Sequence, residues 1–205
     1  MVSGMRIVQT SSAAVLLLAA LALGGCAAPA ASSGGVAEAT PEATRTSSAA
    51  TLDAEPATGD LITGDGYSYT VPEGWAVPEQ EVSGFAPDTY VVDLQDADGF
   101  ADNVNVIASP AGLLSADRVE EAGVSELEAA GATAIEVKDR VLVAESEAVH
   151  VTASIETAGT AYALEQYYVS DDDQTYIVTF SFSESLAAAD RDAIAGSVLV
   201  TWAWS

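Results

Sequence analysis

His150 is the only histidine of the 205-residue chain, and histidine is the side chain whose unperturbed pKa suits a general base near neutral pH. Nucleophilic hydrolysis needs a serine or cysteine beside such a base, and the chain has neither a Gly-x-Ser-x-Gly nor a Ser-x-x-Lys motif. In the alternating run from Val149 to Ile155, His150 falls opposite Val149 and Val151, which predicts a partly exposed strand residue. We therefore expect no catalytic residue and no enzymatic activity.

Three acids surround Gly99 and could bind a cation: Asp96, Asp98 and Asp102. Aligning Gly99 with the sharp-turn glycine of a calcium loop places Asp96 and Asp98 at ligand positions. The first and last ligand positions then fall on Leu94 and Asn105, which carry no carboxylate. The segment therefore favours a polar turn, with a calcium site as the alternative. A structural zinc is excluded, because such sites draw on several cysteines or histidines, and we expect no cofactor.

Aromatic side chains are a further set of groups able to bind a ligand. They could line a cleft for an apolar molecule or a sugar, because such sites combine aromatic surfaces with a few polar groups. The alternative, which we favour, is that they fill the core between a sheet and its helices. The candidates are Trp75, Tyr162, Tyr168, Trp202 and Trp204.

The charge balance narrows the class of partner. The chain has 31 acidic and 6 basic residues and a net charge of −25. Phosphate backbones are bound by clustered lysine and arginine, so we expect no nucleic acid among the partners. Attraction to cations or to a basic partner is one interpretation, and a solvated acidic surface is the one we favour.

Cys26 is the only cysteine, so it has no internal disulfide partner. The uncharged apolar run from Ala13 to Leu23 precedes it and is shorter than the roughly 20 residues of a membrane-spanning helix. With Arg6 before this run and small residues after it, residues 1–25 are typical of a secretory signal.

The four residues Leu23, Gly24, Gly25 and Cys26 resemble the lipobox of bacterial lipoproteins. This resemblance implies that the sulfur of Cys26 carries a diacylglyceryl group and that cleavage makes Cys26 the first residue. Two acyl chains hold a protein stably on a membrane, whereas a single chain does so only marginally. We therefore expect a lipid anchor on the outer face of the bacterial cytoplasmic membrane.

Residues 26–62 are expected to form a tether, and residues 63–205 a single domain. Between Ala27 and Asp60 the chain is rich in Ala, Thr, Ser and Pro, and Val36 and Leu52 are its only large aliphatic residues. Such a composition buries too little apolar surface to offset the entropy lost on ordering, which predicts disorder.

Beyond residue 62, the periodicity predicts an α+β domain. One helix is expected over residues 116–130, capped by Ser115 and ended by Gly131, and another over residues 185–195. The C-terminal residues 198–204 fit a strand, with a continued helix as the alternative. An antiparallel sheet of six or seven strands, sandwiched by the helices, follows from this order. The strands are expected at 66–71, 90–94, 103–108, 135–143, 149–156, 161–170 and 174–183.

Three motifs carry a resemblance to a known family: YTVPEGW (Tyr69 to Trp75), FADNVNVI (Phe100 to Ile107) and YIVTFSF (Tyr176 to Phe182). They resemble the PsbP-like fold, and more closely the actinobacterial lipoproteins of the LpqN type. The resemblance implies a central antiparallel sheet sandwiched by helices, outside the cytoplasmic membrane. It implies no catalytic motif, since proteins of this fold differ widely in function.

Together these patterns favour a non-enzymatic, membrane-anchored binding module of the cell envelope. Its partner would be an envelope protein or an apolar ligand. The alternatives are a carrier of a lipid or glycan in a cleft of the domain and, third, a hydrolase.

Overall fold

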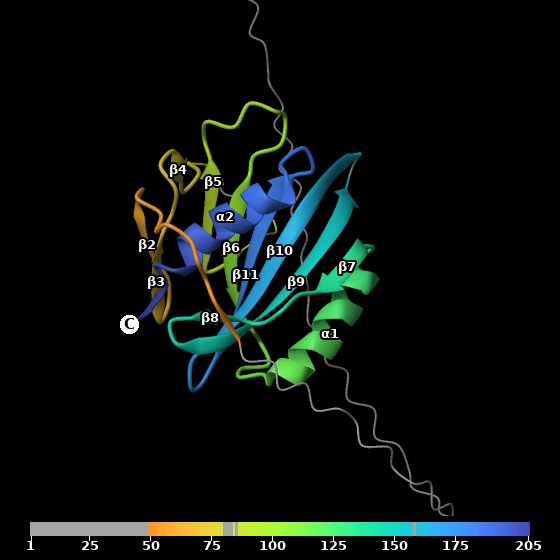
Figure 1. The fold of residues 1–205 in the computed structure, drawn as a ribbon. Coiled ribbons are helices and arrows are strands. Elements are labelled where there is room, and N and C mark those ends of the chain that lie inside the picture. The colour runs from red at the N-terminus through yellow and green to blue at the C-terminus, as the bar shows by residue number, and fades with distance from the viewer. Residues whose placement is uncertain (1–48, 80–83, 85, 158) are drawn as a thin grey trace, which may run out of the picture.

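The computed structural model describes residues 49–79, 84, 86–157 and 159–205. The predicted signal peptide, the lipobox residues and Cys26 lie outside these residues, so their roles stay predictions. The described part forms a nine-stranded sheet, a three-stranded sheet and two helices (Figure 1). The larger sheet contains β1 (Ala50–Thr51), β4 (Trp75–Ala76), β5 (Thr89–Asp93), β6 (Asn103–Ala108), β7 (Thr133–Val137), β8 (Val141–Val143), β9 (Ser146–Thr157), β10 (Thr160–Ser170) and β11 (Thr175–Ser183).

The larger sheet has the strand order β1-β8-β9-β10-β11-β6-β5-β4, with β7 also paired to β9. Every pairing is antiparallel except the one between β1 and β8, which is parallel. The predicted α+β class is therefore confirmed, with more strands than the six or seven expected. The additional strands include β1 and β4, which are too short to leave an alternating pattern in the sequence.

The two helices cover opposite faces of this sheet. In β10, Tyr162, Leu164 and Tyr168 pack with α1 (Ala116–Ala129), whereas Tyr167 and Val169 belong to the core beneath α2 (Ala188–Leu199). Alternate residues of one strand thus face different helices, as the pleat requires. Because both faces are covered, the central strands are buried on both sides.

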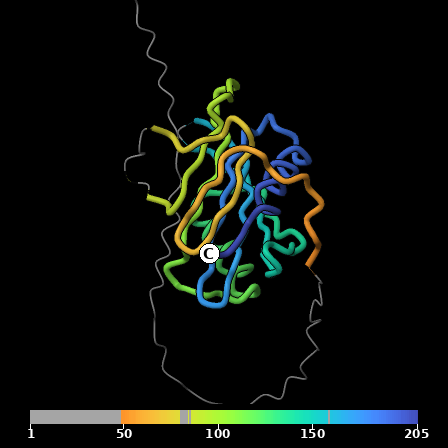
Figure 2. The backbone as a smooth tube through the Cα atoms, turned by 90° about the vertical axis from the view of Figure 1, so that its left-hand side faces the viewer, coloured from red at the N-terminus to blue at the C-terminus, as the bar shows by residue number. Residues whose placement is uncertain are grey.

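A smaller sheet, in the order β12-β3-β2, packs on the α2 side of the molecule. It comprises β2 (Leu61–Thr63), β3 (Tyr67–Thr70) and β12 (Ala203–Trp204). The C-terminal residues lie beside the β2–β3 hairpin, as Figure 2 shows. This second sheet was not predicted from the sequence, because its strands have only two to four residues.

Residues 49–62 belong to the fold, although the sequence predicted a tether up to residue 62. Backbone hydrogen bonds hold them: Ala50 N–H donates to the Arg140 carbonyl at 2.8 Å, and Ala57 N–H to the Ser197 carbonyl at 2.9 Å. Leu52 also packs against the core. The composition of residues 49–62 could not predict that they are ordered, since backbone hydrogen bonds do not depend on apolar side chains.

The bounds of the two helices were predicted from the sequence with different accuracy. Ser115 caps α1 as predicted, because its hydroxyl accepts the Arg118 N–H at 3.4 Å. The second helix runs over Ala188–Leu199 rather than 185–195, and it buries Val198 and Leu199. Of residues 198–204, assigned to a strand, only 203–204 pair in β12, so this prediction was partly wrong. No helix within the described residues has the length and apolar character needed to cross a membrane.

Candidate functional site

A buried ion-pair cluster lies between the large sheet and α2. His150 of β9 and Glu165 of β10 are only 6% and 2% exposed, and Nε2 of His150 lies 2.8 Å from Oε2 of Glu165. The prediction of a partly exposed His150 was wrong, because both faces of β9 are covered. The ring of His150 also stacks on Tyr167, with centroids 4.1 Å apart.

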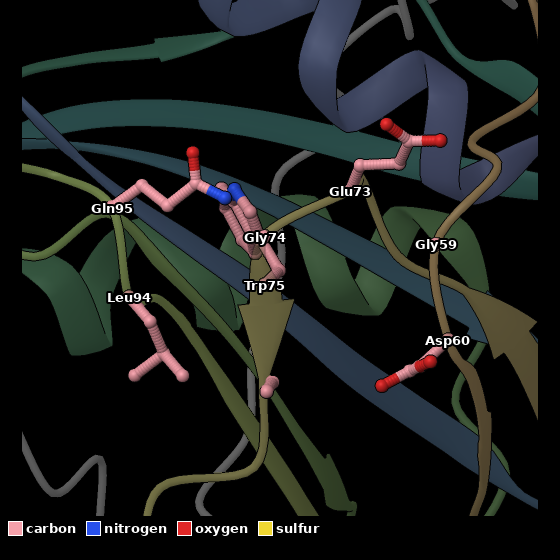
Figure 3. A pocket seen from close by; sticks show the side chains of 8 residues that line it. Gly59, Asp60, Glu73, Gly74, Trp75, Leu94 and Gln95 are labelled. Carbon is pink, nitrogen blue, oxygen red and sulfur yellow. The ribbon is translucent and has the colours of Figure 1, made fainter.

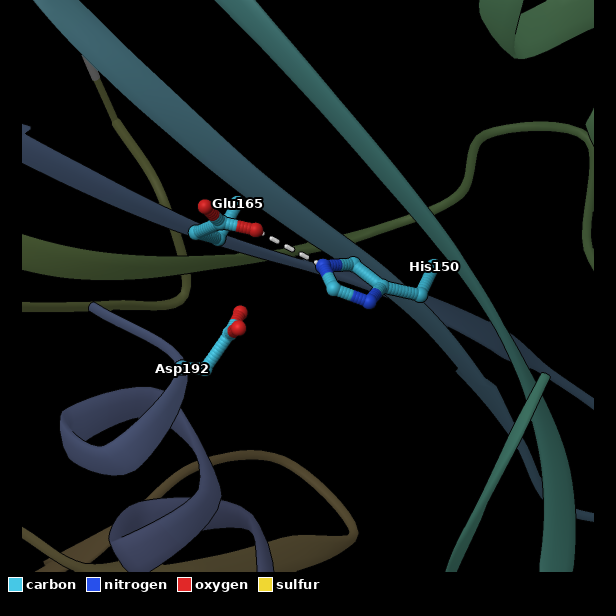
Figure 4. Close-up of side chains that lie close together, drawn as sticks. All are labelled: His150, Glu165 and Asp192. Carbon is cyan, nitrogen blue, oxygen red and sulfur yellow. Dashed lines mark hydrogen bonds and ion pairs between the residues drawn. The ribbon is translucent and has the colours of Figure 1, made fainter. Parts of the chain in front are cut away.

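Two side chains of α2 complete this group, which we call the His150 cluster (His150, Glu165, Arg191 and Asp192). The Arg191 guanidinium donates from Nε to Oε1 of Glu165 at 3.2 Å and from Nη1 to the Leu186 carbonyl at 3.0 Å. The exposed Asp192 side chain points from α2 toward His150 and Glu165 (Figure 4). Burial first, and then the negative charges of Glu165 and Asp192, raise the pKa of Tyr167 beneath them.

Sequence patterns did not predict Glu165, Arg191 or Asp192 as site residues. One signal was present: Glu165 and Gln166 are adjacent polar residues within an otherwise apolar run of β10. In a strand covered on both faces, adjacent positions point to opposite faces, so both of these polar side chains must be buried. A buried carboxylate requires a charged or hydrogen-bonding partner, but the sequence could not name it.

The acids around Gly99 are used in local hydrogen bonds. The Asp96 carboxylate accepts the N–H groups of Asp98 and Asp102, and Asp98 accepts the N–H of Phe100 and the hydroxyl of Ser185. Asp102 accepts the Ser183 N–H at 2.7 Å. The three carboxylates thus shape a turn, and they do not form a ligand group among the described residues.

Asp102 is 8% exposed, and burial raises its pKa to about 6, with smaller contributions from the negative charges nearby. The folded state therefore holds this proton more tightly than the unfolded state, whose pKa is near 3.8. This contribution to stability is complete below pH 3.8 and is lost as the pH rises through about 6. Replacement by asparagine, Asp102→Asn, is expected to raise the free energy of unfolding at pH 8 by about 1–3 kcal/mol, a gain that disappears toward pH 4.

Urea unfolding at pH 4, 6 and 8 measures this difference. Asp98→Asn is the matched control in the same turn, because hydrogen bonds from Ser183 and Phe100 lower the pKa of the exposed Asp98. Its substitution should reduce stability at pH 8 and have less effect as the pH falls. Equal pH profiles for the two variants would contradict the assignment.

The aromatic candidates do not line one shared cleft. Trp202 is buried against Tyr67 and Tyr69, whose rings stack on it with centroids 4.5 and 5.7 Å away. Tyr162 and Tyr168 lie on the opposite face of the sheet, in the core beneath α1. Trp204 is half-buried and packs edge-on against Trp202. All five candidates, Trp75 included, thus pack in or against the two cores, as the favoured interpretation predicted.

Trp75 is only 5% exposed and belongs to the core beneath α2, but it also borders an open hollow. The hollow has a volume of about 450 Å³ and is lined by β4, the turn before it, the residues just before β2 and the residues just after β5 (Figure 3). We call it the Trp75 hollow; its lining residues are Gly59, Asp60, Glu73, Gly74, Trp75, Ala76, Leu94 and Gln95.

The lining of the Trp75 hollow is both acidic and apolar. Asp60 and Glu73 are exposed carboxylates, and Leu94 is 63% exposed. Gly74 has a φ of +92°, and a Cβ there would lie 2.5 Å from Nε2 of the Gln95 side chain. The Pro-x-Gly-Trp turn found in the sequence therefore lets the Gln95 side chain lie against the turn.

No family model matches the chain, and no curated protein matches it. A solved structure from Bacteroides thetaiotaomicron VPI-5482 is 11% identical over 68% of this chain, with a TM-score of 0.42. The match spans 45% of that protein, less than half of its length.

Two further solved structures are similar over more of their own length. LpqN of Mycobacterium tuberculosis, described as involved in cell envelope biogenesis, is 15% identical over 71% of this chain and 90% of its own, with a TM-score of 0.48. The cyanobacterial PsbP (CyanoP) of Synechocystis sp. PCC 6803 is 16% identical over 71% and 92%, with a TM-score of 0.49. At these identities the likeness concerns the fold alone.

Proposed function

We propose that the protein is a lipid-anchored, extracytoplasmic module that binds a partner protein of the cell envelope and catalyses no reaction. The observation that carries this proposal is the Trp75 hollow, which combines exposed carboxylates with exposed apolar surface. Its volume of about 450 Å³ lies in the range of small binding sites, and it is open to solvent.

The charges and the apolar surface of the hollow favour one kind of partner segment. Asp60 and Glu73 attract a cationic side chain, while Leu94, 63% exposed, offers apolar contact for a neighbouring side chain above the buried Trp75. A segment with lysine or arginine next to apolar residues satisfies both requirements, and complementary charge also speeds its association. The carrier function receives less support, because Tyr162, Tyr168 and Trp202 are used in packing.

The sequence supports the proposed position in the cell. The signal-like residues 1–25, the lipobox Leu23 to Cys26 and the LpqN-type motifs support export and lipidation at Cys26. Cys26→Ser is expected to move the protein from the membrane fraction to the soluble or secreted fraction. Metabolic labelling with an alkyne fatty acid should label the parent chain and leave Cys26→Ser unlabelled. Retention of the variant on membranes would contradict the anchor.

Binding at the hollow is tested by site-specific photo-cross-linking in cells. A benzophenone amino acid at Leu94 should give a covalent adduct with an envelope protein, and the same group at Leu142 should give none. Adding Glu73→Lys should reduce the Leu94 adduct at least about fivefold by repelling a cationic segment. Glu128→Lys, an exposed reversal on α1, is the charge control. An adduct insensitive to Glu73→Lys would contradict the site.

A further inference from the structure

We propose that His150, Glu165 and Asp192 bind one divalent transition-metal ion, with Zn²⁺ as the reference case. The site is separate from the Trp75 hollow and does not depend on the proposed partner. Among the described residues, these three are the one group of histidine and carboxylate side chains whose ligand atoms come together, all lying within 4.8 Å of one another. They extend from β9, β10 and α2 toward a common point (Figure 4).

The geometry is close to that of a four-coordinate site. Zinc lies about 2.0–2.2 Å from nitrogen and oxygen ligands, which places tetrahedral ligands roughly 3.4 Å apart. Nε2 of His150 and Oε2 of Glu165 lie 2.8 Å apart, so binding requires them to separate by about 0.6 Å. The Asp192 carboxylate closes the remaining distance by a side-chain rotation, since it is exposed at the surface of α2.

The surroundings hold two of the three ligands in place before any metal arrives. Arg191 binds Oε1 of Glu165, the oxygen that faces away from His150, and leaves Oε2 as the ligand. Tyr167 stacks against the imidazole and fixes the plane of its ring. Contacts of this kind orient ligands and raise metal affinity in known sites.

One imidazole nitrogen and two carboxylates as ligands favour a particular class of metal ion. An imidazole nitrogen favours zinc and its first-row neighbours over calcium and magnesium, which prefer oxygen alone. Three protein ligands with an exposed third residue leave a fourth position open to water. The exclusion of a structural zinc from the sequence rested on cysteine and histidine ligands alone, whereas the fold brings two carboxylates, Glu165 and Asp192, to His150.

Calorimetric titration with ZnCl₂ tests the site on the full chain carrying Cys26→Ser, which removes the only thiol as a competing ligand. Excess Mg²⁺ in the buffer occupies the many exposed carboxylates. We expect one Zn²⁺ per chain. Titration with Co²⁺ should give the visible d–d absorption of a four-coordinate ion with nitrogen and oxygen ligands.

Two neighbouring acids of α2 provide a matched pair. Asp192→Asn should weaken Zn²⁺ binding at least about tenfold, whereas Asp190→Asn should leave the affinity within about twofold. Both residues are exposed, so neither variant endangers folding. His150→Gln should abolish the Co²⁺ absorption. Equal affinities for Asp192→Asn and Asp190→Asn, or weak binding of several ions without Co²⁺ bands, would overturn the proposal.

Discussion

Trp202→Ala is expected to lower the free energy of unfolding by about 3–5 kcal/mol. Trp202 is 5% exposed and lies where α2, the smaller sheet and the large sheet meet. Its ring is stacked on Tyr67 and Tyr69, so truncation removes both the burial of a large side chain and these aromatic contacts. The cavity left behind cannot collapse easily, because strands on either side are fixed by backbone hydrogen bonds.

Urea unfolding followed by circular dichroism measures this loss. Trp204→Ala serves as the control, since Trp204 is half-buried and its loss should cost about 1 kcal/mol. Trp202→Phe is informative as well, because Nε1 of Trp202 is buried and has no hydrogen-bond partner. Phenylalanine removes that unsatisfied donor, so it should be tolerated far better than alanine. Equal losses for Trp202→Ala and Trp204→Ala would contradict the central position of Trp202 in this core.

Glu165→Ala is the second substitution with a large expected effect. Measured in metal-free protein, it should reduce the free energy of unfolding by about 3–5 kcal/mol. Glu165 is 2% exposed and joins His150 to Arg191, so its removal leaves two polar groups partly buried without their shared partner. The penalty arises mainly from those groups, because a buried ion pair contributes little net stability when intact.

A double-mutant cycle separates these contributions. Glu165→Ala and Arg191→Ala should be non-additive by more than about 1 kcal/mol, since each removes the partner of the other. Glu165→Gln keeps the shape and one acceptor oxygen, and its loss should be smaller. Additive losses in the cycle would show that the two side chains do not interact across the interface between α2 and the sheet.

The sequence predicted the elements that have a clear period. The alternation of Tyr176, Val178, Phe180 and Phe182 marks β11, and Ser115 with Gly131 bounds α1. The β1 strand could not be predicted, because Ala50 and Thr51 pair through backbone groups that any sequence possesses. The periodicity of a sequence thus predicts which side chains are buried, but it does not predict which strands pair through their backbones.

The two candidate sites could not be predicted from the sequence for a different reason. Asp192 lies among several exposed acids, and only the packing of α2 on the sheet brings it toward His150. The Trp75 hollow likewise combines Gly59 and Leu94, which are far apart in the chain. Both sites depend on tertiary contacts, which cannot be predicted from the residue pattern of a single sequence. Charge and composition predict which classes of partner are disfavoured, but they do not predict which surface of the domain would bind a partner.

The strand order has a consequence for orientation. The first described strand, β1, and the strand that carries Trp75, β4, occupy opposite edges of the large sheet. Seven inter-strand spacings of about 4.8 Å separate them, roughly 30 Å across the twisted sheet. With the lipid on Cys26, the anchored segment would enter the domain at the β1 edge, so the Trp75 hollow would lie at the edge of the sheet farthest from the point of attachment.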